Sequence, residues 1–350
     1  MPALTHFLPG RGHSITYAGA LLWALLAACQ PQRESAATAS PPPVGHYEGS
    51  LSVTGQPELR TALDIRHPSP GHYEAEFTVP NASTLSFVAD TMLFSNNQLR
   101  LTRPARPNQT LTLTLDGDFW RGSLALDSTK ATIILLKRGM PTPSTYRVEE
   151  VPQPNGTAWL FAPSDTGTLG TALALLPDAA TAPAAALWAD ALAREGVIVL
   201  VLPAADSATA ADEGPRVQAA VRLLRNTAGA DTADVGAWAA GPRAAVLPQV
   251  LTAANAPRVA FAIAQNPELD AASQAALREL KNRKLPLLGL YGGPSATQRA
   301  TALRNAFGGR RGITIRTYRA AGTDLFVGEG LSPRFATGLP MELMEWLRGR

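Results

Sequence analysis

Residues 184–204, AAALWADALAREGVIVLVLPA, predict a helix followed by a buried strand. In residues 184–196 the apolar side chains recur at helical spacing, and Gly196 stands where helices commonly end. Residues 197–204 are rich in β-branched side chains and uncharged, which is typical of a central strand in a parallel sheet. Because parallel strands are joined through crossover helices, this stretch predicts an α/β fold.

The same alternation continues on both sides of this stretch and predicts a doubly wound, mostly parallel sheet within residues 145–350. The apolar runs predict further strands, which lie at 171–178, 234–241, 258–265, 285–293 and 313–321. The amphipathic segments between them predict helices, which lie at 217–227 and near 243–253, 270–283, 296–307 and 339–348.

Residues 46–139 have a different pattern and predict a small all-β domain before the α/β domain. Eight segments of roughly 6–9 residues alternate apolar and polar side chains, with Gly, Pro, Asn or Asp between them. Since open sheet edges favour aggregation, closure into a sandwich or a barrel is expected. The spacer 140–144 separates the two domains.

The first 45 residues predict a targeting signal followed by a flexible tether. Residues 1–28 have the features of a secretory signal peptide, with a 14-residue apolar run at 15–28 that is too short to span a bilayer. The run ends in Leu-Ala-Ala before Cys29, which resembles a bacterial lipoprotein box and predicts lipidation of Cys29. The alternative is an ordinary signal peptide with a chance cysteine. Residues 29–45 are polar and rich in Pro, Ser and Ala, as in a flexible tether.

A lipid anchor on Cys29 predicts that the protein is attached to a membrane of the bacterial cell envelope. Several acyl chains on one cysteine would give stable membrane attachment, and Gln30 resembles outer-membrane sorting signals.

Composition narrows the function classes. The chain has 350 residues, a net charge of +3 and 45% apolar residues, so a disordered protein is excluded and nucleic-acid binding is disfavoured. Cys29 is the only cysteine, which excludes an intrachain disulfide and a cysteine metal cluster. No cofactor motif occurs, and neither a cofactor nor a metal is expected. The histidines lie at positions 6, 13, 46, 67 and 72, so residues 73–350 contain no imidazole.

Within residues 150–350 the order of elements is similar to that of the α/β-hydrolase family. The resemblance rests on LAREGVIVLVLP (192–203), VGAWAAGPRAA (235–245) and YRAAGTDLF (318–326). The all-β segment is similar to a module that precedes the catalytic domain in secreted hydrolases of Bacteroidetes-type bacteria, through G-x-Y-x-G-x-L at 45–51 and Trp-x-Gly at 120–122.

This family needs Gly-x-Ser-x-Gly at a tight strand-to-helix turn, an acid and a histidine. The resemblance aligns Ala239 with the nucleophile, Ser295 with the acid and Asp324 with the histidine. It also implies that the backbone N–H groups of Ala240 and Gly241 form an oxyanion-like site. We expect Ala239 to occupy the tight turn and these triad positions to converge at the carboxyl ends of their strands.

The missing imidazole and serine predict a protein that is inactive as a serine hydrolase. It would act by binding a small apolar ligand or a protein partner. One alternative is an active hydrolase of esters or acyl compounds, with a water activated by Asp178 or Asp324; a second is a structural partner of an active relative. Asp178 itself is expected to be a solvated loop acid.

Overall fold

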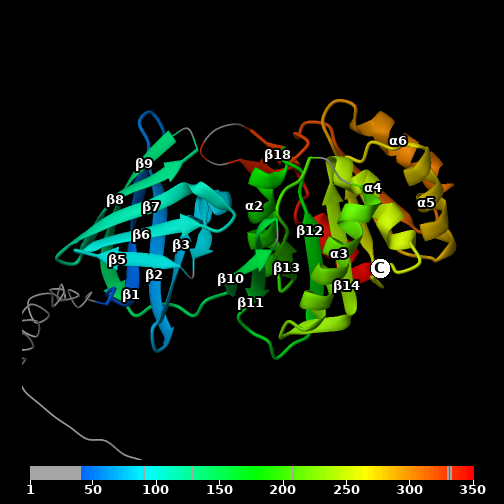
Figure 1. Ribbon diagram of the computed structural model, residues 1–350. Coiled ribbons are helices and arrows are strands. Elements are labelled where there is room, and N and C mark those ends of the chain that lie inside the picture. Colours follow the sequence, from blue (N-terminus) through cyan, green and yellow to red (C-terminus); the bar gives the residue numbers. More distant parts are fainter. Residues whose placement is uncertain are drawn as a thin grey trace, which may run out of the picture. The chain divides into compact units, whose positions relative to one another are not determined.

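The computed structural model describes residues 41–350, apart from residues 90, 128, 154, 207, 208, 329, 330 and 332. Cys29 and the predicted signal peptide lie outside the described residues. The described chain contains a nine-stranded antiparallel sheet and an eight-stranded mixed sheet, coloured blue to cyan and green to orange in Figure 1. A ribbon of β18 (Phe326–Val327) and β19 (Arg334–Phe335) follows them.

The nine-stranded sheet is nearly closed and surrounds one apolar core. Its strands, in chain order, are β1 (Gly45–Ser52), β2 (Leu59–Ser69), β3 (His72–Thr78), β4 (Phe87–Ala89), β5 (Met92–Ser95), β6 (Gln98–Arg103), β7 (Arg106–Asp116), β8 (Phe119–Leu126) and β9 (Thr129–Gly139). Their order in the sheet is β4-β3-β2-β1-β9-β8-β7-β6-β5. The two edges approach each other, since β4 contacts β6 and β3 contacts β5. Of the two closures expected, this connectivity corresponds to the barrel.

Alternation of side chains builds the interior of this sheet. In β6 and β7, Leu99, Leu101, Leu111 and Leu113 are fully buried, while the residues between them are mostly exposed or half-buried. Two details differ from the expectation. One of the eight alternating segments, residues 83–89, begins in a 3₁₀ helix, η1 (Pro80–Leu85), where a strand was expected. The four-residue β5 was not predicted because so short a run carries little periodic signal.

The eight-stranded sheet confirms the prediction of a mostly parallel sheet. It consists of β10 (Tyr146–Gln153), β11 (Gly156–Pro163), β12 (Gly170–Leu176), β13 (Ile198–Val201), β14 (Ala230–Ala240), β15 (Ala262–Gln265), β16 (Leu287–Gly292) and β17 (Ile313–Tyr318). The order is β10-β11-β13-β12-β14-β15-β16-β17. Strand β11 runs antiparallel to both of its neighbours, and the other neighbouring pairs from β13 to β17 are parallel. The hairpin β10–β11 was not predicted.

Helices cover both faces of this sheet, as expected of a doubly wound fold. They are α2 (Ala182–Arg194), α3 (Ala210–Arg225), α4 (Gly241–Thr252), α5 (Ala271–Asn282), α6 (Ala296–Phe307) and α7 (Met341–Gly349). Helices α3 to α6 share one apolar core with the sheet, and α2 and α7 share the other (Figure 1). None of the helices in the described part of the chain has the length and apolarity needed to cross a bilayer.

The two sheets contact each other directly. Val88 of β4 packs in the same core as Tyr146 of β10, and its backbone N–H donates to the Tyr146 hydroxyl at 3.2 Å. Arg194 of α2 donates to the Glu76 carboxylate of β3 at 2.9 Å. Residues on the outer face of β5 and β6 and residues at the carboxyl end of β13 line one common cavity.

Candidate functional site

The carboxyl ends of β12 and β14 form the natural crevice of the parallel sheet. Strand β12 leads into α2 on one face, and β14 leads into α4 on the other. In open α/β sheets, ligands bind where neighbouring connections leave on opposite faces. The candidate site therefore lies between the loop after β12 and the start of α4.

The tight turn at this site lies two residues beyond the expected position. Ala239 is fully buried inside β14, in register with Leu176 on one side and Ala264 on the other. The strand continues to Ala240, and Gly241, the first residue of α4, has a φ of +57°. Only glycine adopts this left-handed conformation at little cost, so the run of alanines stays in the strand and the chain turns at Gly241.

Asp178 fills the space that a side chain at this turn would occupy. An ideal Cβ on Gly241 would lie 2.0 Å from Oδ2 of Asp178. The other carboxylate oxygen, Oδ1, accepts hydrogen bonds from the backbone N–H and the hydroxyl of Thr181, at 2.8 and 2.5 Å. Asp178 is only 9% exposed, so the expectation of a solvated loop acid is wrong. Its carboxylate holds Thr181, the residue before α2, and brings negative charge to the turn.

The other two aligned positions, Ser295 and Asp324, lie in the loops that follow β16 and β17. Ser295 is exposed and precedes α6 without capping it through its side chain. Asp324 accepts a hydrogen bond from the backbone N–H of Phe326 at 3.1 Å, and its carbonyl accepts one from Trp188 at 3.3 Å. No hydrogen bond in the described part of the chain joins Ala239, Ser295 and Asp324 to one another.

Two buried amide side chains connect the strand ends instead. Gln265 and Asn266, at the end of β15, each donate to the carbonyl of Thr323 at 2.7 Å. Gln265 also accepts from the indole N–H of Trp238 at 3.0 Å, and Asn266 accepts from the backbone N–H of Gly292 at 3.1 Å. Amides do not titrate, so this network holds the loop after β17 without a proton-transfer group. Neither residue was predicted to belong to the site, although the polar pair Gln265 and Asn266 at the end of the apolar run was a usable signal.

A buried ion pair lies behind the site and was also missed. Arg243 of α4 is 1% exposed and donates to the Glu213 carboxylate of α3 at 2.8 Å. It also donates to the carbonyls of Pro177 and Pro203, both at 2.9 Å, which are in the loops after β12 and β13. Burial lowers the pKa of Arg243, and the hydrogen bond and charge of Glu213 oppose that change. One guanidinium therefore holds two loops and two helices together.

A cavity of about 510 Å³ lies beside this edge of the sheet. Its wall includes Pro177, Leu202 and Pro203 from the loops after β12 and β13, but neither Asp178 nor Gly241. Other parts of the wall come from the nine-stranded sheet. Among the described residues, no group of three or more His, Cys, Asp or Glu side chains is placed to hold a metal ion.

Comparison with known proteins gives no family and a distant structural similarity. No family model matches the chain, and no curated protein matches it. A solved structure from Klebsiella pneumoniae subsp. pneumoniae, named "Putative Dienelactone Hydrolase", is similar, with 14% identity and a TM-score of 0.45. The match covers 59% of this chain and all of that one. Similarity at this level carries no argument about activity.

Proposed function

We propose that residues 145–350 form a non-catalytic domain of the α/β-hydrolase fold and that the protein acts by binding a ligand or a partner. In that fold the nucleophile stands on the strand-to-helix turn, and one oxyanion donor comes from the loop after the third strand. The corresponding places here are Gly241 and the loop at Pro177 and Asp178, since β12 is the third strand of its sheet in chain order.

The observation that carries the proposal is that the residue at the turn has no side chain and that a carboxylate from the loop after β12 lies in that place. Gly241 has no nucleophilic atom, and the Asp178 carboxylate occupies the space where a Cβ would stand. A catalytic hole of this kind stabilises negative charge through aimed N–H donors. A fixed carboxylate at the same place opposes that charge, which argues against an acyl-transfer transition state there.

The part of the chain that forms this site also has no imidazole to act as a general base. Residues 73–350 contain no histidine. His46 and His72 lie on β1 and β3, and His67 lies on β2, where its ring stacks on Tyr73. His46 contacts the carboxylates of Asp64 and Glu48 within the same sheet. All three imidazoles therefore belong to the nine-stranded sheet.

We expect no reaction of the protein with a fluorophosphonate probe and no turnover of p-nitrophenyl esters above the buffer rate, because the serine at the turn and the histidine that would activate it are both missing. Labelling is read by intact-protein mass spectrometry, and hydrolysis by absorbance. The variants Asp178→Asn and Asp324→Asn are measured in parallel. Stoichiometric labelling of a serine, or turnover that one of these variants abolishes, would establish the alternative of an active hydrolase with non-standard residues.

The proposed anchor is a lipid on Cys29, which the sequence motif supports. Expressed with its leader in a bacterial host, the wild-type chain is expected in the membrane fraction, because multiple acyl chains bind a bilayer stably. The variant Cys29→Ala is expected in the soluble fraction, while Gln32→Ala, in the same tether, should fractionate like the wild type. Recovery of wild-type protein in the soluble fraction, or of Cys29→Ala in the membrane, would argue against the anchor.

A further inference from the structure

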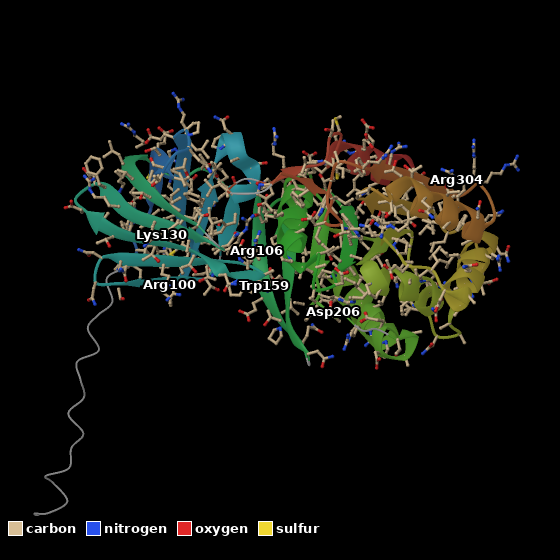
Figure 2. All side chains as sticks on the ribbon, turned by 90° about the horizontal axis from the view of Figure 1, so that it is seen from above. Arg100, Arg106, Lys130, Trp159, Asp206 and Arg304 are labelled. Atoms are coloured by element: carbon tan, nitrogen blue, oxygen red, sulfur yellow. The ribbon has the colours of Figure 1, made fainter. Side chains whose placement is uncertain are left out.

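One face of each sheet contributes to the wall of the 510 Å³ cavity, whose volume is in the range of small-molecule sites. Glu150, Trp159 and Val201 stand in register across β10, β11 and β13, so their side chains leave the eight-stranded sheet on the same face. On the nine-stranded sheet, Leu93 of β5 stands in register with Arg100 of β6. All of these residues line the cavity. Figure 2 shows Arg100 on the nine-stranded sheet and Trp159 on the other sheet.

The part of the wall that follows β12 and β13 is apolar because its backbone polar groups have partners elsewhere. Pro177, Leu202 and Pro203 line this part. The carbonyls of both prolines accept hydrogen bonds at 2.9 Å from the buried guanidinium of Arg243, which is not part of the wall. The N–H of Leu202 donates to the carbonyl of Leu175 at 2.9 Å. The same contacts hold the loops in place, so this part of the cavity is formed before a ligand enters.

The charged residues of the described wall favour neither an anion nor a cation. Arg100 and Glu150 are exposed, carry opposite charges and come from different sheets. Neither forms an ion pair within the described part of the chain. Arg103 also belongs to the wall, but its guanidinium donates to the carbonyls of Thr84 and Ser86, at 2.8 and 3.0 Å, and neither of these two residues lines the cavity. A charged ligand would therefore lose hydration against the apolar wall without meeting an excess of opposite charge.

The apolar side chains that the two sheets contribute are only partly covered. Leu93 is 65% exposed, and Trp159 is half-buried. Trp159 is the one aromatic residue of the described wall. Because an indole offers a large flat apolar surface, it packs best against another ring, in an offset or an edge-to-face arrangement.

We propose that this cavity binds a neutral, mostly apolar molecule with a planar ring system. The rings pack against Trp159 on one sheet and Leu93 on the other, and against the prolines after β12 and β13. The inference rests on the proposed binding function. It deepens that function by naming the class of ligand and by placing the ligand beside the turn at Gly241 instead of in it, since Gly241 is not part of the wall.

The test uses two fluorescent probes with the same aromatic skeleton. N-Phenyl-1-naphthylamine is neutral, and 8-anilinonaphthalene-1-sulfonate carries an added sulfonate. The neutral probe is expected to bind with one-to-one stoichiometry and a Kd below about 100 µM. The anionic probe is expected to bind at least about fivefold more weakly, since the wall offers its sulfonate no net opposite charge.

Two precautions keep the signal specific to the cavity. All measurements use the full chain with Cys29→Ala, because a lipid anchor and the membrane around it would take up both probes. The anionic probe also binds partly unfolded proteins, so each variant is first checked by near-ultraviolet circular dichroism.

Two variants and their matched controls locate the binding. Ala204 is exposed and lines the cavity, so Ala204→Trp should fill it and weaken the neutral probe about tenfold or more, while Ala302→Trp, at an exposed position of α6 outside the described wall, should not. Leu93→Asp removes apolar contact area and should weaken the neutral probe about three- to fivefold. Its control, Leu169→Asp, changes a leucine that is 66% exposed and lies outside the described wall, and should leave the affinity as it is.

The outcomes separate this inference from the proposed function. Equal or tighter binding of the anionic probe, or unchanged binding of the neutral probe by Ala204→Trp, would overturn the neutral site while the protein stayed non-catalytic. Fluorophosphonate labelling of a serine would overturn the non-catalytic proposal and would leave the probe affinities unaffected.

Discussion

Replacing Glu213 by glutamine is expected to lower the free energy of unfolding by about 3–5 kcal/mol, as is typical when one partner of a buried ion pair is removed. The change keeps the shape of the side chain and creates no cavity. It leaves the guanidinium of Arg243, which is 1% exposed, without its directly bonded carboxylate. Because Arg243 also holds the carbonyls of Pro177 and Pro203, the loops at the candidate site should loosen together with α3 and α4.

Urea denaturation followed by circular dichroism measures this effect. The matched control is Glu279→Gln, which removes the carboxylate of an exposed pair with Arg283 at 2.9 Å and should cost less than about 0.5 kcal/mol. The double variant Arg243→Met with Glu213→Leu removes both charges and should recover much of the loss. A cost for Glu213→Gln no larger than that of the control would show that the pair does not hold these loops.

Replacing Gly241 by alanine is expected to destabilise the protein by about 2–3 kcal/mol. The left-handed φ of +57° costs a residue with a Cβ about 1 kcal/mol or more. The new Cβ would also lie 2.0 Å from Oδ2 of Asp178, so that carboxylate must leave its two hydrogen bonds with Thr181, at about 1 kcal/mol or more.

A matched control and a double-mutant cycle separate the two costs. Gly293 has a φ of +92°, and a Cβ placed there meets no atom within 4 Å, so Gly293→Ala carries the backbone cost alone. In the background of Asp178→Ala the cost of Gly241→Ala should fall toward that of Gly293→Ala, because the overlap is gone. Additive costs in the cycle would mean that Asp178 does not fill the turn.

Local patterns in the sequence predicted most of the α/β architecture. The helix and strand at 184–204 appear as α2 and β13, and the following alternation appears as β14 to β17 with α4 to α7. Periodicity succeeded there because each element buries one face or is wholly buried. The hairpin β10–β11 and the short β5 were not predicted, since strand pairing and not composition defines them.

The candidate site shows the limit of local patterns most clearly. The motif at 237–241 placed the turn at Ala239, yet pairing with Leu176 and Ala264 keeps that residue in the strand. The register of the neighbouring strands decides where β14 ends, and that register is a property of the whole sheet. Gln265 and Asn266 became part of the site only through the loop at Thr323, 57 or more residues away.

The sequence by itself determined the chemistry that is missing. A chain without histidine after position 72 cannot place an imidazole among the strands of its α/β part, whatever its register. Only the tertiary structure decided that the Asp178 carboxylate lies where a side chain at the turn would be. Asp178 and Arg243 carry side chains that normally lie at the surface, and here they are buried against Gly241 and Glu213, which the fold brings to them from distant parts of the chain. The burial of these two charges depends on residues that are distant in the chain, and for that reason no local pattern predicts it.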